Sequence, residues 1–317
     1  MSAGPPFAPG APGCDLLDAG VAMRNAIVDD LLRLDGVAVT CAAGAAPGCG
    51  PRPAWRGARL ATAAPGHGED VDAFVARLAA THDLCWIVAP ETGGELARLR
   101  AAVGDARWIG CDAAAIECAA SKRATLAALG AAGVRTPLDR AATHRGRWIV
   151  KPDDGAGCLS TRVHADRATA LSSWQAGATT LEPFVEGEAL SISMIVGADL
   201  AEAVSFNRQH IEIDAAGQLH DRGVRAATLD RDTDPRIACL DAVAAATARA
   251  LPGLGGFVGI DVVWNQERGA VVIEVNPRVT CAYVGLSARL GRNLAADILR
   301  LKAMGATHRE ARHGAPA

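Results

Sequence analysis

The sequence predicts two units in series, an α/β N-terminal domain followed by a larger α+β unit. The first prediction rests on helix and strand patterns that alternate as far as about residue 110, which is typical of parallel α/β packing. The second rests on paired strand patterns joined by short turns, with helical stretches between them. The chain has 317 residues, 50% of them hydrophobic, which is enough for two or three compact units with their own cores.

Hydrophobic periodicity defines the N-terminal domain. Residues 18–34 place apolar side chains at helical spacing, and "VAVTC" after them has the composition of a strand. Residues 71–83 predict a second helix, and "LCWIVAP" predicts a buried strand that ends at Pro90. The stretches "ELARLRAAV" and "RWIGCDAAAIECAASKRATLAALGAAGV" continue the alternation.

The α+β unit begins with "RWIVKPDDGAGCLSTRVH", which predicts two strands joined by a glycine-containing loop. We then expect a helix at 168–175, an extended segment at 179–187, a hairpin that turns at Gly197–Asp199, a helix at 236–251, a hairpin at 256–277 and a closing helix at 293–304. We therefore divide the chain into a flexible tail (1–14), an N-terminal α/β domain (15–110), a small lobe with a central linker (111–186), a C-terminal lobe with a candidate metal site (187–305) and a second tail (306–317).

Composition and charge argue against several functional classes. A formal net charge of -3 and a pI near 6.2 provide no polycationic surface for bulk nucleic-acid binding. No apolar run reaches the roughly 18 residues that a membrane span needs. The start "MSAGPPFAPGAPG" lacks the features of a secretory signal, so we expect a cytoplasmic protein. The nine cysteines include no C-x-x-C pair, and we expect them to be reduced thiols.

The last predicted hairpin carries three polar residues on apolar strands. Glu274 and Asn276 are two residues apart and so share one face of their strand, and a turn near 266–269 would bring Asp261 beside them. Two carboxylates close together and partly out of water repel each other unless a cation joins them. Oxygen ligands of this kind suit Mg²⁺. The alternative is a half-exposed sheet whose polar face is simply solvated.

A glycine-containing loop follows the strand that ends with Lys151. Gly155 and Gly157 let the backbone approach an anion, and a lysine beside the loop would neutralise phosphate charge. The loop lacks the G-x-x-x-x-G-K-[ST] pattern, and a plain hairpin turn with a surface lysine is the alternative. A second lysine, Lys122, lies in the first turn of a predicted helix, where anions are favoured, although a solvated lysine is common there.

Two further stretches complete the pattern. "TTLEPFVEGEALSIS" has the composition of a linker between two lobes that can offer backbone groups to an adenine edge and carboxylates to ribose, or else of an ordinary connection. "GLGGFVG" (253–259) resembles a dinucleotide fingerprint, but Val258 stands where that pattern needs glycine and a strand follows. We therefore expect a loop that leads into the last hairpin.

The order of these features from Asp112 to Leu290 resembles the ATP-grasp superfamily, and the preceding α/β unit looks like the N-terminal domain of that family. The resemblance implies an ATP-grasp fold in which two lobes clamp ATP, with Mg²⁺ as metal and Mn²⁺ as a substitute. It implies that the metal is bound by Asp261, Glu274 and Asn276, and that the ATP phosphates are bound by Lys122 and Lys151 and covered by a closing loop with Asp154, Gly155, Gly157 and Cys158. It also implies adenine contacts from Glu182, Phe184 and Val185 and a ribose contact from Glu188. Lys151 and Arg278 would have a catalytic role. Many members place the ribose acid one residue later, where this chain has Ala189.

Within the superfamily, "NPRVTCAYVGLS", "SFNRQHIEI" and "LLDAGVAMRNAIVDDL" look most similar to the tyramine–L-glutamate ligases of methanofuran and methylofuran assembly. The strand expected before residues 18–34 is missing or merged into the tail. The resemblance implies that a small carboxylate, an amine and ATP give an amide, ADP and phosphate through an acyl phosphate. Arg208 and Arg225 are candidates to hold an amino-acid carboxylate, with surface ion pairs as the alternative, and Tyr283 is a candidate for the amine pocket or for packing.

Three other functions stay open from the sequence: an ATP-grasp ligase for a different pair of substrates, an ATP-binding regulatory or carrier protein without turnover, and a kinase for a small molecule. The partners expected are small-molecule carboxylates and amines, with no nucleic acid and no membrane. The oligomeric state is open, although a homodimer is common in this superfamily.

Overall fold

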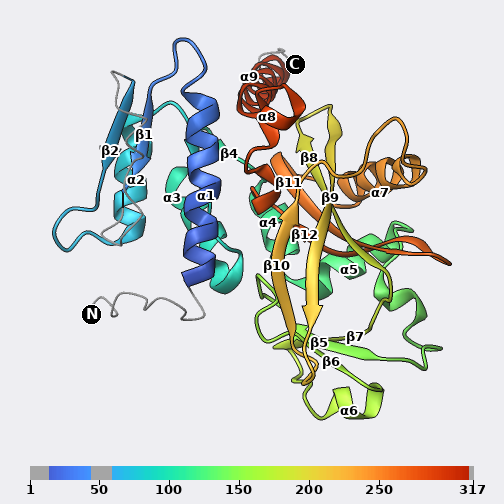
Figure 1. Cartoon of the computed structure of the whole chain (residues 1–317). Coiled ribbons are helices and arrows are strands. Elements are labelled where there is room, and N and C mark those ends of the chain that lie inside the picture. The colour runs from blue at the N-terminus through green and yellow to red at the C-terminus, as the bar shows by residue number, and fades with distance from the viewer. Residues whose placement is uncertain (1–13, 44–58, 314–317) are drawn as a thin grey trace.

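The computed structural model describes residues 14–43 and 59–313, with the N-terminal domain on the left of Figure 1 and the α+β lobes on the right. Helix α1 (Cys14–Leu31) starts at the last residue of the predicted N-terminal tail, whose other residues lie outside the described part. Helix α9 (Leu294–His313) extends past the predicted boundary at residue 305, so much of the predicted second tail is helical.

The N-terminal domain contains two small parallel sheets, which agrees with the predicted parallel α/β packing. Strand β1 (Val39–Ala42) pairs with β2 (Leu60–Ala63), and β3 (Cys85–Trp86) pairs with β4 (Trp108–Ile109). Asp70 caps the start of helix α2 (Val71–Thr81), since its Oδ1 accepts a hydrogen bond from the Ala73 N–H at 2.8 Å. Helix α3 is Glu95–Val103. Our sequence reasoning missed β2, a short strand with no buried residue.

The small lobe begins with two consecutive helices, α4 (Ala113–Ala120) and α5 (Lys122–Ala131). Its three-stranded antiparallel sheet has the order β6-β5-β7 and is built from Trp148–Pro152 (β5), Arg162–His164 (β6) and Thr179–Pro183 (β7). The predicted glycine-containing loop joins β5 to β6. The helix expected at 168–175 is the short α6 (Arg167–Leu171).

The C-terminal lobe is a five-stranded antiparallel sheet with the order β10-β9-β8-β11-β12. The predicted hairpin that turns at Gly197–Asp199 is confirmed, and so is the last hairpin. Our reasoning missed β10, whose stretch "LHDRGVR" has little hydrophobic pattern. The elements are β8 (Glu188–Val196), β9 (Ala201–Ile213), β10 (Leu219–Arg225), α7 (Ile237–Ala250), β11 (Gly256–Asn265), β12 (Gly269–Asn276) and α8 (Leu286–Leu290).

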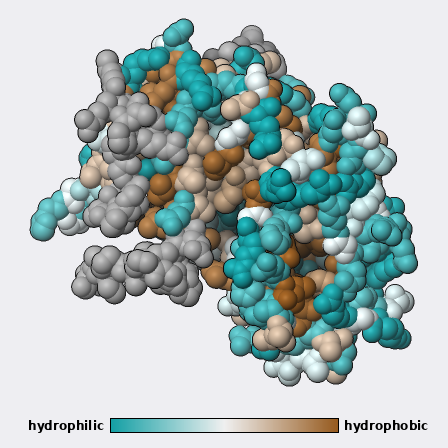
Figure 2. Space-filling view, viewed as in Figure 1, coloured by the Kyte–Doolittle hydropathy of each residue, from teal (hydrophilic) through white to brown (hydrophobic). Residues whose placement is uncertain are grey.

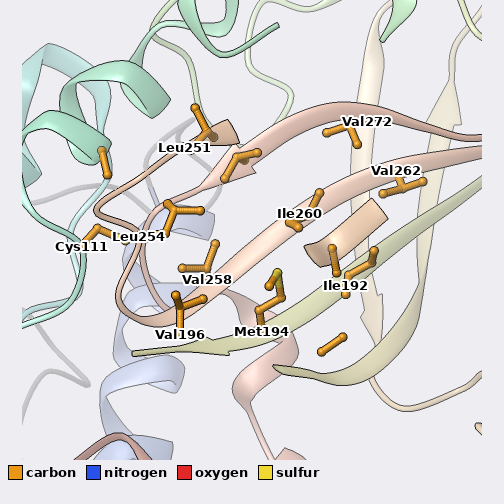
Figure 3. Close-up of a cluster of buried hydrophobic side chains, with 14 of the residues drawn as sticks. Cys111, Ile192, Met194, Val196, Leu251, Leu254, Val258, Ile260, Val262 and Val272 are labelled. Atoms are coloured by element: carbon orange, nitrogen blue, oxygen red, sulfur yellow. The ribbon is translucent and has the colours of Figure 1, made fainter. Parts of the chain in front are cut away.

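One hydrophobic cluster joins the N-terminal domain to the face of this sheet that α7 covers. It includes Leu96 and Leu99 of α3, Leu240 of α7 and alternate residues of β8 and β11. Figure 3 shows Cys111 and Leu254 close to Val258 at one end of this cluster. The domains therefore share a core, which fixes the position of the turns after β3 and β4 against the sheet.

The glycines of "GLGGFVG" serve this close packing. A Cβ added to Gly253 would lie 2.2 Å from Asp112 Oδ2, and one added to Gly255 would lie 2.8 Å from the Gly110 carbonyl oxygen. Residues 253–255 form the predicted loop that leads into the last hairpin, whereas residues 256–259 already belong to β11. Within residues 14–43 and 59–313, every helix is too short or too polar to span a bilayer.

Candidate active site

A cavity of ≈ 2020 Å³ lies where the N-terminal domain and the two lobes meet. The space-filling view is hollowed near its centre, with apolar residues gathered around the hollow (Figure 2). The predicted site residues that line the cavity are Lys122, Lys151, Gly155, Gly157, Cys158, Glu182, Phe184, Val185, Asp261, Glu274, Asn276 and Arg278. The structure thus gathers residues from α5, the glycine-containing loop, the linker and the last hairpin on one wall.

The last hairpin places the three candidate metal ligands together. Asp261 on β11 is directly opposite Glu274 on β12, and Asn276 Nδ2 donates to Asp261 Oδ2 at 3.2 Å. A second amide, Gln209 Nε2 on β9, donates to Asp261 Oδ1 at 2.9 Å. Burial and the Glu274 charge raise the pKa of the Asp261 carboxyl to about 7 although both amides oppose the shift. The direction of this shift is the one expected for two carboxylates that lie close together and partly out of water.

A β-bulge in the β11–β12 hairpin changes where Ile273 of β12 lies. The register shifts between Asp261 and Val262, and Ile273 is the residue of β12 left without a partner. Simple alternation along β12 would direct Ile273 and Val275 away from the polar face together. Val275 is buried in the core, whereas the Ile273 carbonyl oxygen lies 3.5 Å from Lys151 Nζ, the donor. The bulge therefore supplies a backbone oxygen at the cavity wall.

Two buried lysines pair directly with carboxylates at the cavity wall. Lys122 Nζ is 3.1 Å from Glu274 Oε1 and donates to the Gly155 carbonyl oxygen at 2.5 Å. Lys151 Nζ is 3.0 Å from Glu182 Oε2, and these two side chains are only 5% and 1% exposed. Lysine is seldom buried unless it is paired. The surface-lysine alternatives for both residues do not describe this structure.

The first turn of α5 holds an anion of the chain itself. Asp153 accepts hydrogen bonds from Ser121 Oγ at 2.8 Å and from the Arg123 N–H at 2.9 Å. The helix start therefore does hold an anion, and that anion is the Asp153 carboxylate of the chain itself. This contact anchors the beginning of the glycine-containing loop beside Lys122.

The glycine-containing loop is held in an uncommon backbone conformation. Gly157, Cys158 and Ser160 have φ values of 66°, 58° and 52°, in the left-handed region that side chains other than glycine rarely adopt. Gln218 Nε2, in the β9–β10 connection, donates to the Cys158 carbonyl oxygen at 3.3 Å. Asp154 does not line the cavity, and its Oδ2 accepts a hydrogen bond from the Gly93 N–H at 3.0 Å.

The linker places Phe184 and Val185 at the cavity, but Glu188 lies on the other side of β8. Ala189 and Ser191 line the cavity, whereas the Glu188 carboxylate pairs with Arg208 Nε at 2.6 Å and with Arg236. Side chains alternate along a strand, so the position one residue after Glu188 faces the site. This placement corrects our expectation that Glu188 contacts ribose.

Arg208 and Arg225 also face away from the cavity. They are directly opposite each other in the β9–β10 ladder, while the neighbouring pair Gln209 and Val224 lines the cavity. The surface ion pair that we considered as the alternative describes Arg208, through Glu188. The structure therefore does not support either arginine as a substrate ligand.

Tyr283 packs in the core. It is 1% exposed, its hydroxyl donates to Asp30 Oδ2 at 2.8 Å, and its ring meets Trp86 and Phe257 edge-on at 6.1 and 5.2 Å. The packing alternative describes this residue. Because Asp30 is on α1, Tyr283 ties that helix to the turn before α8.

Arg278 lines the cavity and its guanidinium group contacts three other groups. Its Nε lies 3.0 Å from the Glu91 carboxylate, its NH1 donates to the Val279 carbonyl oxygen at 3.2 Å, and its NH2 donates to Asn276 Oδ1 at 3.4 Å. Arg278 is therefore attached both to a candidate metal ligand and to the N-terminal domain.

Sequence reasoning missed Gln209 and Glu91. Gln209 continues the period-two polar series of Ser205 and Asn207 on β9, the same signal that identified Glu274 and Asn276. Glu91 follows directly after Pro90, at the end of the predicted buried strand, where α/β folds place ligand-binding residues. Both signals were readable from the sequence.

Comparison with known families identifies the fold. The ATP-grasp domain family matches residues 119–282, more than half of the chain, and the pre ATP-grasp 3 domain matches residues 49–116. The chain belongs to the ATP-grasp family. Both halves of the predicted fold class, the N-terminal domain and the ATP-grasp fold, are thereby confirmed.

Two curated relatives of this ATP-grasp protein are tyramine–L-glutamate ligases. The protein from Methanocaldococcus fervens is 33% identical over 108 residues, which are 33% of this chain and 32% of that protein. The protein from Methanocaldococcus jannaschii is 27% identical over 208 residues, which are 64% of this chain and 58% of that protein. The chain thus spans less than two thirds of either relative.

Solved structures share the ATP-grasp fold at low identity. An ATP-grasp superfamily protein from Archaeoglobus fulgidus has a TM-score of 0.62 at 21% identity, over 89% of this chain and 81% of that one. An L-amino acid ligase from Bacillus licheniformis has a TM-score of 0.63 at 19% identity, over 88% and 71%. A D-alanine–D-alanine ligase from Bacillus anthracis has a TM-score of 0.60 at 13% identity, over 90% and 93%.

Proposed function

We propose that this ATP-grasp protein is an ATP- and Mg²⁺-dependent ligase that joins a small carboxylic acid to an amine. The observation that carries the proposal is the polar wall of the cavity, where Asp261, Glu274 and Asn276 lie beside the buried Lys122 and Lys151. A carboxylate pair next to two buried ammonium groups fits a metal bound to a polyphosphate.

The donor set of the hairpin suits a hard cation. Two carboxylates and one amide oxygen provide oxygen ligands only, and the repulsion that raises the pKa of Asp261 would be relieved by a divalent ion. When bound, Mg²⁺ would neutralise charge on the transferring phosphoryl group. Mn²⁺ prefers similar ligands and is expected to substitute.

The lysines and the glycine-containing loop would hold the nucleotide. Lys122 and Lys151 each pair with a carboxylate at the cavity wall and would turn to phosphate oxygens, which carry more charge. The loop from Asp153 to Cys158 would cover the phosphates and exclude water. Glu182, with Phe184 and Val185, would accept the adenine edge.

The reaction would run in two steps. A carboxylate oxygen of the acid attacks the γ-phosphorus of ATP, the bond to the β-phosphate oxygen breaks, and ADP leaves. The uncharged amine nitrogen then attacks the acyl carbon, phosphate leaves with the electron pair of the broken C–O bond, and the nitrogen loses a proton to give the amide. Arg278 would stabilise the oxygens of the phosphoryl and acyl groups with its fork of N–H donors.

For the substrates we propose L-glutamate and tyramine, or a related amine, in methylofuran or methanofuran assembly. Support comes from the two curated relatives, whose names state these substrates, and from the stretches "NPRVTCAYVGLS" and "SFNRQHIEI". Other residues of the cavity wall would hold the acid and the amine, since Arg208, Arg225 and Tyr283 do not line the cavity.

The experiment is ADP release with Mg²⁺, L-glutamate and a panel of amines that includes tyramine, with the products weighed by mass spectrometry. We expect ADP formation that depends on tyramine, and a product one water lighter than glutamate plus tyramine. Turnover that occurs only with a different acid and amine would support the ligase activity and reject L-glutamate and tyramine as the substrates. A phosphorylated product that forms without amine would identify a kinase, and ATP binding without turnover across the panel would identify a binding protein.

A further inference from the structure

A carboxylate of the N-terminal domain lies directly against Arg278. Glu91, in the turn after β3, approaches Arg278 Nε to 3.0 Å, and the two side chains are 10% and 13% exposed. Among the described residues, Arg278 is the one cation within ion-pair distance of Glu91. Breaking a pair this buried leaves an uncompensated charge, so each partner strongly constrains the other.

The geometry separates the two ends of the guanidinium group. Glu91 engages Nε, whereas NH2 donates to Asn276 Oδ1, the oxygen proposed to bind the metal. Arg278 lines the cavity and Glu91 does not. Glu91 therefore holds the guanidinium group at Nε and the Val279 carbonyl oxygen holds NH1, which leaves NH2 as the donor directed at the site.

The same turn also contacts the glycine-containing loop. The Gly93 N–H donates to Asp154 Oδ2 at 3.0 Å, and Gly93 and Gly94 have φ values of 65° and 72°. Only glycine adopts two successive left-handed conformations at little cost, so the turn is shaped to expose this N–H. One turn of the N-terminal domain thus contacts both Arg278 and the loop expected to cover the phosphates.

We propose that Glu91 is a positioning residue for the ligase reaction, acting through Arg278. By fixing Nε it holds the NH2 donor at the metal-site hairpin, toward the phosphoryl and acyl oxygens, before substrate binds. An arginine that is already oriented loses less side-chain entropy on binding and needs less reorganisation in the transition state. The inference rests on the proposed function, and it makes the N-terminal domain part of the catalytic apparatus.

The first test compares Glu91→Gln with wild type in steady-state turnover and in the ratio of ADP to amide. We expect kcat to fall roughly tenfold or more, because a misplaced arginine weakens transition-state stabilisation. The KM for ATP should stay within about twofold, since Glu91 is outside the cavity lining, and the ADP-to-amide ratio should rise above one as acyl phosphate is lost to water.

The matched control is Asp30→Asn. Asp30 is another buried carboxylate that joins α1 to the C-terminal lobe, through Tyr283, and it has no contact with Arg278. This variant should lower Tm while kcat and the ADP-to-amide ratio stay near wild type. If Glu91→Gln behaves like Asp30→Asn, Glu91 is structural and the proposal fails.

A double-mutant cycle tests whether Glu91 acts through Arg278. In the Arg278→Lys background, Glu91→Gln should lower kcat by a much smaller factor than it does in wild type, because the oriented guanidinium is already gone. Additive losses in kcat would overturn the proposal. If Arg278→Lys is too slow to measure, the steady-state comparison with Asp30→Asn decides.

A spectroscopic measurement needs no turnover. In protein labelled with ¹⁵N-arginine, the Nε–H resonance of Arg278, assigned by its loss in Arg278→Lys, should be protected from exchange and should lose that protection in Glu91→Gln. An unprotected resonance in wild type would contradict the contact. A protected resonance in a wild-type protein that releases no ADP would instead leave the contact in place and reject the ligase function.

Discussion

The charged residues on the two faces of the five-stranded sheet differ in their burial and in their partners. On the cavity face, Asp261 and Glu274 lie side by side and meet amide and ammonium donors in partly buried surroundings. On the face toward α7, Glu188 and Arg208 form an ion pair whose side chains are 39% and 47% exposed. Because side chains alternate along a strand, a step of one residue separates a proposed catalytic role from a surface ion pair.

The largest loss of amide formation is expected from substitutions on the cavity face of the sheet. Changing Glu274→Gln or Asp261→Asn removes one of the two carboxylates and should lower amide formation by ~100-fold or more, because charge on the transferring phosphoryl group is then poorly neutralised. Circular dichroism should show an intact fold. Wild-type turnover in the double variant would reject the metal site.

Substitutions in the buried Lys151–Glu182 ion pair should affect both turnover and stability. Lys151→Met leaves Glu182 buried without its cation and should lower the free energy of unfolding by about 3–5 kcal/mol. Adding Glu182→Gln should recover much of the stability but none of the activity, since the phosphate ligand is still missing. Chemical denaturation and ADP release report the two effects separately. Recovery of turnover in the double variant would argue against a phosphate contact.

Tyr283 should behave as a residue that faces the core. Tyr283→Phe removes one hydrogen bond to the buried Asp30 and should cost about 1–2 kcal/mol of stability, while Ser287 still donates to that carboxylate. The KM for the amine should not change. A selective rise in that KM, with Tm unaffected, would restore the tyrosine to the substrate pocket.

The smallest effect is expected at Glu188. Glu188→Gln should leave turnover unchanged and lower stability by about 0–1 kcal/mol, because exposed ion pairs are screened by water. Partial burial opposes ionisation, but Arg208 and Arg236 hold the pKa of this carboxyl below its ordinary value. A depressed pKa stabilises the fold above the unfolded pKa, so the difference in Tm between wild type and Glu188→Gln should be present at pH 7.

That difference should shrink as the pH falls through the folded pKa of Glu188, since both states then carry the protonated carboxyl. Thermal melts of the two proteins from pH 7 to pH 3 give the comparison. A KM for ATP that rises in Glu188→Gln would instead place this acid at the ribose.

Alternation along strands explains what the sequence could and could not predict. It placed Glu274 and Asn276 on one face, and it would have placed Gln209 there had the period-two series on β9 been followed. It could not choose between Glu188 and Ala189, because the face that a strand presents to a cavity depends on sheet packing. The bulge at Ile273 is likewise a property of the pairing.

Contacts between distant segments were the other limit. Glu91 and Arg278 are 187 residues apart, and each lies in a turn whose position is set by the core shared between the domains. Local pattern carries no information about such a pair. The turn residues themselves, a proline followed by an acid and two glycines, were visible as a loop after a buried strand.

The central claim is that the β11–β12 hairpin and the two lysines bind a metal–nucleotide complex. The most direct measurement is calorimetric titration of the protein with a non-hydrolysable ATP analogue, with and without Mg²⁺, in wild type, Glu274→Gln and Glu188→Gln. Our account predicts Mg²⁺-dependent binding that Glu274→Gln weakens at least tenfold and Glu188→Gln leaves unchanged. Equal binding by all three proteins, or binding indifferent to Mg²⁺, would contradict it.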